Sequence, residues 1–115
     1  MDRSQLLRGT LDAAALAVVA AEDGYGSDVV RRLRAAGLSD VGDASVYGTL
    51  RRLYHGGALT SYVMPSDEGP HRRYYGITDL GRAQLAEARE TWADFARALT
   101  SLLETMPIEI VEVSA

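Results

Sequence analysis

The chain has 115 residues, a net charge of −4 and no cysteine, and all twelve of its strongly basic residues are arginines. This length suits one compact domain with an added element for association. The absence of cysteine excludes disulfides and thiolate metal sites, and no apolar run approaches the roughly 20 residues that span a bilayer. We therefore expect a cytoplasmic protein with no membrane partner, no metal and no cofactor.

The first third of the chain predicts two helices. Apolar residues at spacings of three and four form one stripe over residues 4–22, which is typical of an amphipathic helix. A second helix is expected over about 27–36, with Ser27 or Gly26 as its N-cap. Gly37 follows in the position where helices favour a left-handed residue, so it should end this helix.

A third helix is predicted over residues 44–56. Val46, Leu50 and Leu53 share one face, which we expect to be the core side. Tyr47 lies at the flank of that face. The opposite face carries a small and basic set of residues: Ala44, Ser45, Gly48, Arg51 and Arg52.

Two strands joined by a polar turn should follow the third helix. Residues 59–64 and 71–77 are the predicted strands, and 65–70 the turn, because it holds two prolines with Ser and Gly. Arg72 and Arg73 enter the second strand. A helix followed by such a hairpin is the arrangement of a winged helix-turn-helix, which places one helix in the DNA major groove and a hairpin beside it.

The acidic net charge counts against nucleic-acid binding, because DNA-binding domains are often basic. The charge is unevenly distributed, however. Residues 44–75 carry four arginines and two acids, a net +2, whereas the remainder carries eight arginines and fourteen acids, a net −6. The positive charge therefore lies where the helix and hairpin are predicted, and a local patch can attract phosphates.

The last helix is expected over residues 79–106, followed by a mobile tail over 107–115. Its apolar residues repeat at the a and d positions of a heptad, which is typical of helices that pair with another helix. We expect a second copy of the chain to cover this seam. The a and d series are Leu85, Trp92, Leu99 and Met106, and Ala88, Phe95 and Leu102.

Four stretches of the sequence resemble the PadR-like transcriptional regulators, specifically the short subgroup with a single C-terminal helix. They are LLRGTLDAAALAVV, GYGSDVVRRLR, SVYGTLRRLYHGGAL and GPHRRYYGITDLGRAQL, and together they extend over most of the chain. Gly48 departs from the family pattern, in which proline is common at this position. A glycine there allows the backbone to approach DNA closely, although it costs helix stability.

The resemblance implies a homodimer that binds near-palindromic double-stranded operators, mostly to repress. It also implies a small aromatic effector at the dimer interface, because some family members respond to one. On this basis the DNA-binding residues are Ser45, Tyr47, Gly48, Arg51, Arg52, Arg72 and Arg73. The residues of the dimer interface or of an effector site are Leu85, Trp92, Phe95, Leu99 and Leu102.

The predicted fold class is mainly α with a small β-hairpin, divided into a winged domain (1–78), a dimerisation helix (79–106) and a tail (107–115). We find no residue set for catalysis. Three alternatives stay open. The module could bind a protein or a small molecule instead of DNA, Trp92 and Phe95 could form a plain dimer core, and Arg52 could turn back to an acidic neighbour.

Overall fold

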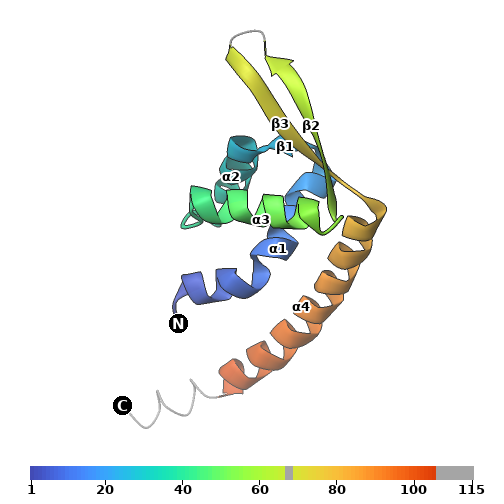
Figure 1. Cartoon of the computed structure of the whole chain (residues 1–115). Helices are drawn as coiled ribbons and strands as arrows, with labels where there is room; N and C mark the ends of the chain where they lie inside the picture. Colours follow the sequence, from blue (N-terminus) through green and yellow to red (C-terminus); the bar gives the residue numbers. More distant parts are fainter. Residues whose placement is uncertain (67–68, 106–115) are drawn as a thin grey trace. The chain divides into compact units, whose positions relative to one another are not determined.

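The computed structural model describes residues 1–66 and 69–105 of the chain, which divide into two compact units after Leu85. Figure 1 shows the elements along the chain. None of the helices in the described part has the length and apolar character needed to cross a bilayer. In chain order the elements are α1 (Arg3–Ala21), β1 (Gly24–Tyr25), α2 (Gly26–Ala35), α3 (Asp43–His55), β2 (Leu59–Ser66), β3 (Gly69–Ile77) and α4 (Asp79–Thr105).

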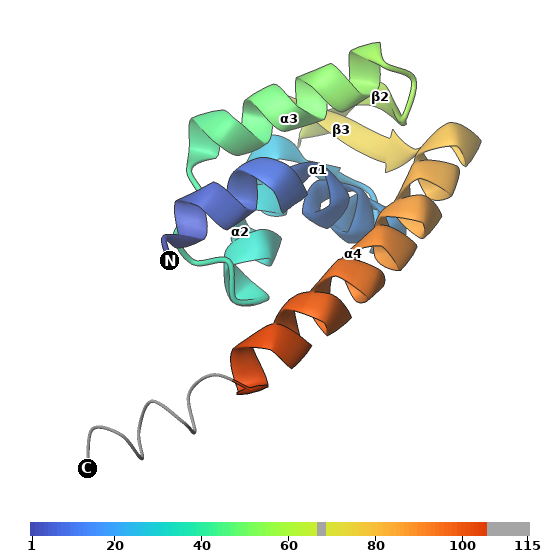
Figure 2. The ribbon, with the colours of Figure 1, turned by 90° about the horizontal axis from the view of Figure 1, so that it is seen from below.

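Helices α1, α2 and α3 pack around one another and enclose the core of the first unit (Figure 2). The inward residues predicted for the third helix are confirmed, since Val46, Leu50 and Leu53 are all buried. Thr49 is buried beside them, so the core face of α3 is broader than predicted. This packing fixes the rotation of α3 and thereby determines which of its side chains reach solvent. The other buried apolar residues are Leu11, Ala15, Leu16, Val19, Val29, Val30, Leu33, Val41, Ala58, Leu59 and Leu85.

Glycines follow the ends of α2 and α3, and the one after α2, Gly37, was predicted from the sequence. Gly37 has a φ of 114° and Gly57 a φ of 85°, both in the left-handed region that favours glycine. The predicted start of α2 was wrong by one or two residues, because the N-cap is Tyr25, whose side chain makes no capping hydrogen bond. Consequently no side chain within the described residues satisfies the first amides of α2 by capping.

The sheet has three antiparallel strands in the order β1-β3-β2, not the two of the predicted hairpin. Strand β1 is the additional one, and it pairs Gly24 with Tyr75 and Tyr25 with Tyr74. Both hairpin strands also extend into the segment predicted as a turn, with a register irregularity between Met64 and Ser66. That irregularity accommodates Pro65, which has no N–H to donate to the ladder.

The first turn of α4 is attached firmly to the loop that follows α3. The hydroxyl oxygen of Thr78 lies 2.6 Å from the carbonyl oxygen of Gly57 and 2.9 Å from that of Ala58, and it accepts a hydrogen bond from the Gly81 amide. A methyl group on Gly81 would lie 2.1 Å from the Ala58 carbonyl oxygen. Only glycine therefore permits this close approach. Leu85, one turn further on, is buried in the core of the first unit.

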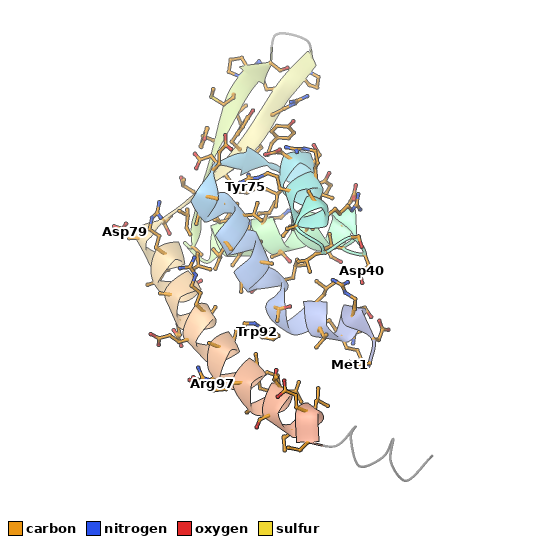
Figure 3. The ribbon with its side chains drawn as sticks, turned by 180° about the vertical axis from the view of Figure 1, so that it is seen from behind. Met1, Asp40, Tyr75, Asp79, Trp92 and Arg97 are labelled. Carbon is orange, nitrogen blue, oxygen red and sulfur yellow. The ribbon has the colours of Figure 1, made fainter. Side chains whose placement is uncertain are left out.

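Beyond Leu85, α4 exposes a series of large apolar side chains. Trp92 is 52% exposed, Phe95 58% and Leu102 64%. Figure 3 shows Trp92 and the charged Arg97 on different sides of this helix. The predicted seam position Met106 and the predicted tail 107–115 lie outside the described residues.

Candidate nucleic-acid interface

The outer face of α3 is open, as the helical periodicity predicted. Ser45 and Arg51 are exposed, and Tyr47 is 37% exposed. A methyl group placed on Gly48 would meet nothing within 4 Å, so the glycine is not required by packing within the first unit. This face can therefore approach a large partner closely. Its polar groups can donate to phosphates and base edges.

Arg52 has a different surrounding from Arg51. Its guanidinium group forms two hydrogen bonds with the Asp12 carboxylate of α1, with lengths of 2.7 Å and 2.9 Å. These bonds, together with the negative charge of Asp12, raise the pKa of Arg52. The alternative that Arg52 turns back to an acidic neighbour is thus the arrangement observed. The pair joins α3 to α1. It also occupies the two terminal guanidinium nitrogens of Arg52, which a bidentate DNA contact would need.

The two arginines of β3 are held in different ways. The guanidinium carbon of Arg72 lies 4.4 Å from the ring centroid of Tyr25, which is a cation–π geometry. Arg73 donates a hydrogen bond of 3.0 Å to the hydroxyl of Ser61 on β2. Both side chains are exposed. The middle of β3 thus presents two positive charges whose positions are restrained by neighbours.

A row of tyrosines connects β1 with both hairpin strands. Tyr74 meets Tyr25 edge-on at a centroid distance of 5.3 Å and stacks on Tyr62 at 5.7 Å. The Tyr62 hydroxyl donates a hydrogen bond of 2.5 Å to Asp23, and this bond raises the pKa of Tyr62. Such aromatic pairs stabilise by about 0.5–1.5 kcal/mol beyond the area that they bury. The row therefore fixes the hairpin to the segment between α1 and α2.

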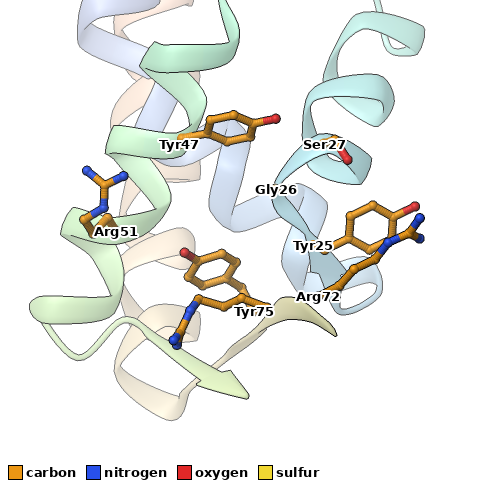
Figure 4. Close-up of a pocket in the computed structure, with 8 residues that line it drawn as sticks. Tyr25, Gly26, Ser27, Tyr47, Arg51, Arg72 and Tyr75 are labelled. Atoms are coloured by element: carbon orange, nitrogen blue, oxygen red, sulfur yellow. The ribbon is translucent and has the colours of Figure 1, made fainter. Parts of the chain in front are cut away.

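A hollow of about 330 Å³ lies between the outer face of α3, the start of α2 and the middle of β3 (Figure 4). We call it the arginine hollow. Four elements (β1, α2, α3 and β3) supply its lining, and no acidic residue is among the lining residues. The lining residues are Tyr25, Gly26 and Ser27 at the start of α2, Tyr47 and Arg51 of α3, and Arg72, Arg73 and Tyr75 of β3.

The arginine hollow unites four of the residues predicted to bind DNA, namely Tyr47, Arg51, Arg72 and Arg73. It also includes Tyr25 and Ser27, which the sequence did not indicate as site residues. Only the pairing of β1 with β3 brings them there, and a two-residue strand leaves no periodic signal. Within residues 1–66 and 69–105 no group of three or more potential metal ligands occurs.

A comparison with protein families decides the classification. The profile of the transcriptional regulator PadR-like family matches residues 15–87, which include α2, α3, the hairpin and the start of α4. The chain belongs to the PadR-like family. The resemblance inferred from the sequence motifs is thereby confirmed, and the family is one of transcriptional regulators and not of enzymes.

Solved structures of PadR-like regulators share the fold of this chain. The regulator from Bacillus cereus is 31% identical, with a TM-score of 0.77, and the match covers 86% of this chain and 96% of that one. The regulator from Eggerthella lenta is 32% identical, with a TM-score of 0.78 and 88% coverage of both chains. The single long C-terminal helix of this PadR-like chain is consistent with the short subgroup.

PadR of Bacillus subtilis has been solved in complex with operator DNA. It is 19% identical to this chain, with a TM-score of 0.62, and the match covers 68% of this chain and 45% of that one. At this identity the likeness is one of fold. The winged unit described above therefore has the same fold as part of a protein that binds its operator.

Proposed function

We propose that this PadR-like chain is a homodimeric repressor of transcription that binds near-palindromic double-stranded operators. Helix α3 enters the major groove, and the hairpin β2–β3 lies on the backbone or in the minor groove. One observation carries the proposal: Arg51 of α3 and the two arginines of β3 line the same hollow, beside the open face of α3. Guanidinium groups suit both phosphates and guanine edges.

The operator complex of Bacillus subtilis PadR supports DNA as the partner, because the two proteins share the winged fold. In this proposal Ser45 and Arg51 read base edges, Gly48 lets the backbone of α3 approach the DNA closely, and Tyr47 contacts the DNA backbone. Arg52 is assigned to the ion pair with Asp12 and not to base reading.

The exposed apolar face of α4 supports the homodimer. Phe95 and Leu102 are each more than half exposed in the single chain, and an isolated soluble helix does not stably keep such a row in water. Leu85 is already buried in the first unit, so the seam for a second copy consists of Trp92, Phe95, Leu99 and Leu102. The exposed rings of Trp92 and Phe95 are also the place proposed for a small aromatic effector.

Selection of bound duplexes from a random pool tests the function. We expect enrichment of a near-palindrome whose half-sites lie about 34–36 Å apart, the spacing at which two recognition helices meet one face of DNA. Arg51→Ala should weaken binding to the selected duplex about tenfold, the loss of one charge-assisted contact. Failure to enrich any duplex would contradict the proposal and favour the alternative of a winged module that binds protein.

A further inference from the structure

Nine of the twelve arginines of this chain fall into two groups, and Arg8, Arg82 and Arg89 belong to neither. One group serves the fold through ion pairs with aspartates, and it consists of Arg3, Arg31, Arg32, Arg34, Arg52 and Arg97. The three arginines of the arginine hollow are not in that group. Within residues 1–66 and 69–105, Arg51, Arg72 and Arg73 have no carboxylate within 4 Å. Three such charges along one concave surface attract an anion.

The start of α2 adds uncharged donors to the same concave surface. Gly26 and Ser27 line the hollow, and no side chain caps the helix there. Gly26 also admits the Tyr47 ring, since a methyl group on Gly26 would lie 2.7 Å from a ring carbon. The acidic residue of this first turn, Asp28, is bound to Arg31 and Arg32 and does not line the hollow. An anion in the hollow therefore meets polar residues of α2 together with positive charge and no carboxylate of the lining.

Tyr25 restrains the guanidinium group of Arg72. Its ring lies under the Arg72 guanidinium at 4.4 Å and is itself held edge-on by Tyr74. Long arginine side chains lose considerable rotamer entropy when they are fixed. A cation–π contact that restrains Arg72 before binding reduces that loss, so Tyr25 acts as a positioning residue for Arg72.

We propose that the arginine hollow seats one phosphodiester group of the DNA backbone in each half-site. This inference rests on the proposed function and deepens it, because it assigns Ser27 and Tyr25 to DNA binding. Ser27 donates its hydroxyl to a phosphate oxygen, and Arg72 and Arg73 supply charge. A phosphate contact carries no sequence information, but it sets the register of the protein on the duplex. Here it fixes how far α3 enters the groove, since Tyr47 and Arg51 of α3 line the same hollow.

A scan with neutral methylphosphonates tests whether the arginine hollow binds a phosphodiester group; we call this proposed contact the seat. The probe is the duplex selected from the random pool, with one backbone phosphate at a time replaced. We expect the parent protein to lose affinity about tenfold at one position in each half-site, which corresponds to one charge-assisted contact. Ser27→Ala and Arg72→Ala should bind the unmodified duplex correspondingly more weakly and should no longer respond to replacement at that position. Arg72→Ala should also flatten the salt slope by about 0.9.

Matched variants distinguish the loss of the phosphate contact from a change in net charge and from a loss of folding. Arg8→Ala removes the same charge from an exposed site on α1 and should keep the parental response to the scan. Tyr25→Phe retains the ring under Arg72 and should bind like the parent, whereas Tyr25→Leu should bind more weakly. Thermal unfolding of each variant verifies that it is folded.

The outcomes distinguish this inference from the proposed function. A parent protein that selects no duplex overturns the function and the seat together. A parent protein that binds its duplex, with hollow variants that keep the full response at every phosphate, overturns the seat and leaves the function intact. A response that is lost equally in Arg8→Ala also overturns the seat, because the effect is then one of net charge.

Discussion

Arg52 of α3 and Asp12 of α1 form a two-bond ion pair across the packed helices, with donor–acceptor lengths of 2.7 Å and 2.9 Å. The adjacent Arg51 lines the arginine hollow instead. Two neighbouring residues of identical type thus have separate tasks, one within the fold and one toward the partner.

Substitution of these two arginines should separate the tasks. Arg52→Ala should lower the free energy of unfolding by up to about 1 kcal/mol, the range of an exposed pair, and should weaken DNA binding less than Arg51→Ala does. Thermal unfolding and duplex titration measure the two effects. The exchange Arg52→Asp with Asp12→Arg should recover stability. Equal losses of DNA affinity from Arg51→Ala and Arg52→Ala would contradict this division.

Two glycines in helices should respond to alanine with opposite signs. Gly81→Ala should lower the free energy of unfolding by about 3 kcal/mol, because its methyl group would lie 2.1 Å from the Ala58 carbonyl oxygen. Gly48→Ala should raise it by up to about 1 kcal/mol, because that methyl group meets nothing within 4 Å. Chemical unfolding measures both. A stabilised Gly48→Ala that binds DNA more weakly would also indicate close backbone approach at this position.

The exposed seam of α4 predicts the state of assembly. Leu102→Asp places a charge at a side chain that is 64% exposed in the single chain, so it should leave the fold of each copy intact. It should nevertheless shift the protein to a monomer and reduce DNA affinity, because both half-sites are then bound independently. Sedimentation equilibrium measures the first effect. Glu104→Asp, a conservative change on the same helix, serves as the control, and a stable dimer of Leu102→Asp would refute the seam.

The hydrogen bond between Tyr62 and Asp23 should be visible in a titration. It raises the pKa of Tyr62 above its usual value of about 10. The stabilisation from this bond is therefore complete below the unfolded-state pKa and is lost as pH rises through the folded-state pKa. Asp23→Asn should move the pKa of Tyr62 downward, as measured by NMR of labelled tyrosine. Asp40→Asn, at a carboxylate that faces Arg3, should leave it unchanged.

Trp92 offers a direct test of the effector. It is the only tryptophan of the chain and lies 6.3 Å from Phe95 between ring centroids. Planar aromatic compounds should quench its fluorescence with a saturable curve if they bind at the seam. Phe95→Ala should weaken this binding. A flat titration would remove the effector from the proposal while leaving the DNA-binding function standing.

Helices α1, α2 and α3 could be predicted because each buries one periodic face. Val46, Leu50 and Leu53 follow the helical period, and their burial orients the outer face of α3 without further information. Local backbone chemistry was equally informative at Gly37, whose positive φ ends α2. These signals depend only on neighbours in the sequence.

Contacts between distant residues could not be predicted in the same way. Strand β1 exists because Tyr25 pairs with Tyr74, 49 residues later in the numbering, and two residues have no recognisable period. The partner of Arg52 lies 40 residues earlier in the chain, so only an open alternative could be stated. The membership of Tyr25 and Ser27 in the arginine hollow has the same origin, since it follows from that strand pairing.

The short strand β1 gives the hairpin β2–β3 two parts, one three-stranded and one two-stranded. Strand β3 has neighbours on both edges only at Tyr74 and Tyr75, where β1 and β2 flank it. Further out, at pairs such as Val63 with Arg73, the ribbon has two strands, and such ribbons tolerate a wide range of twist. The base of the hairpin is anchored at Tyr74 and Tyr75, whereas the outer ribbon, which begins with Arg73 and Arg72, can adapt to grooves of different width. A single regulator can in this way accommodate operators that differ in local DNA shape.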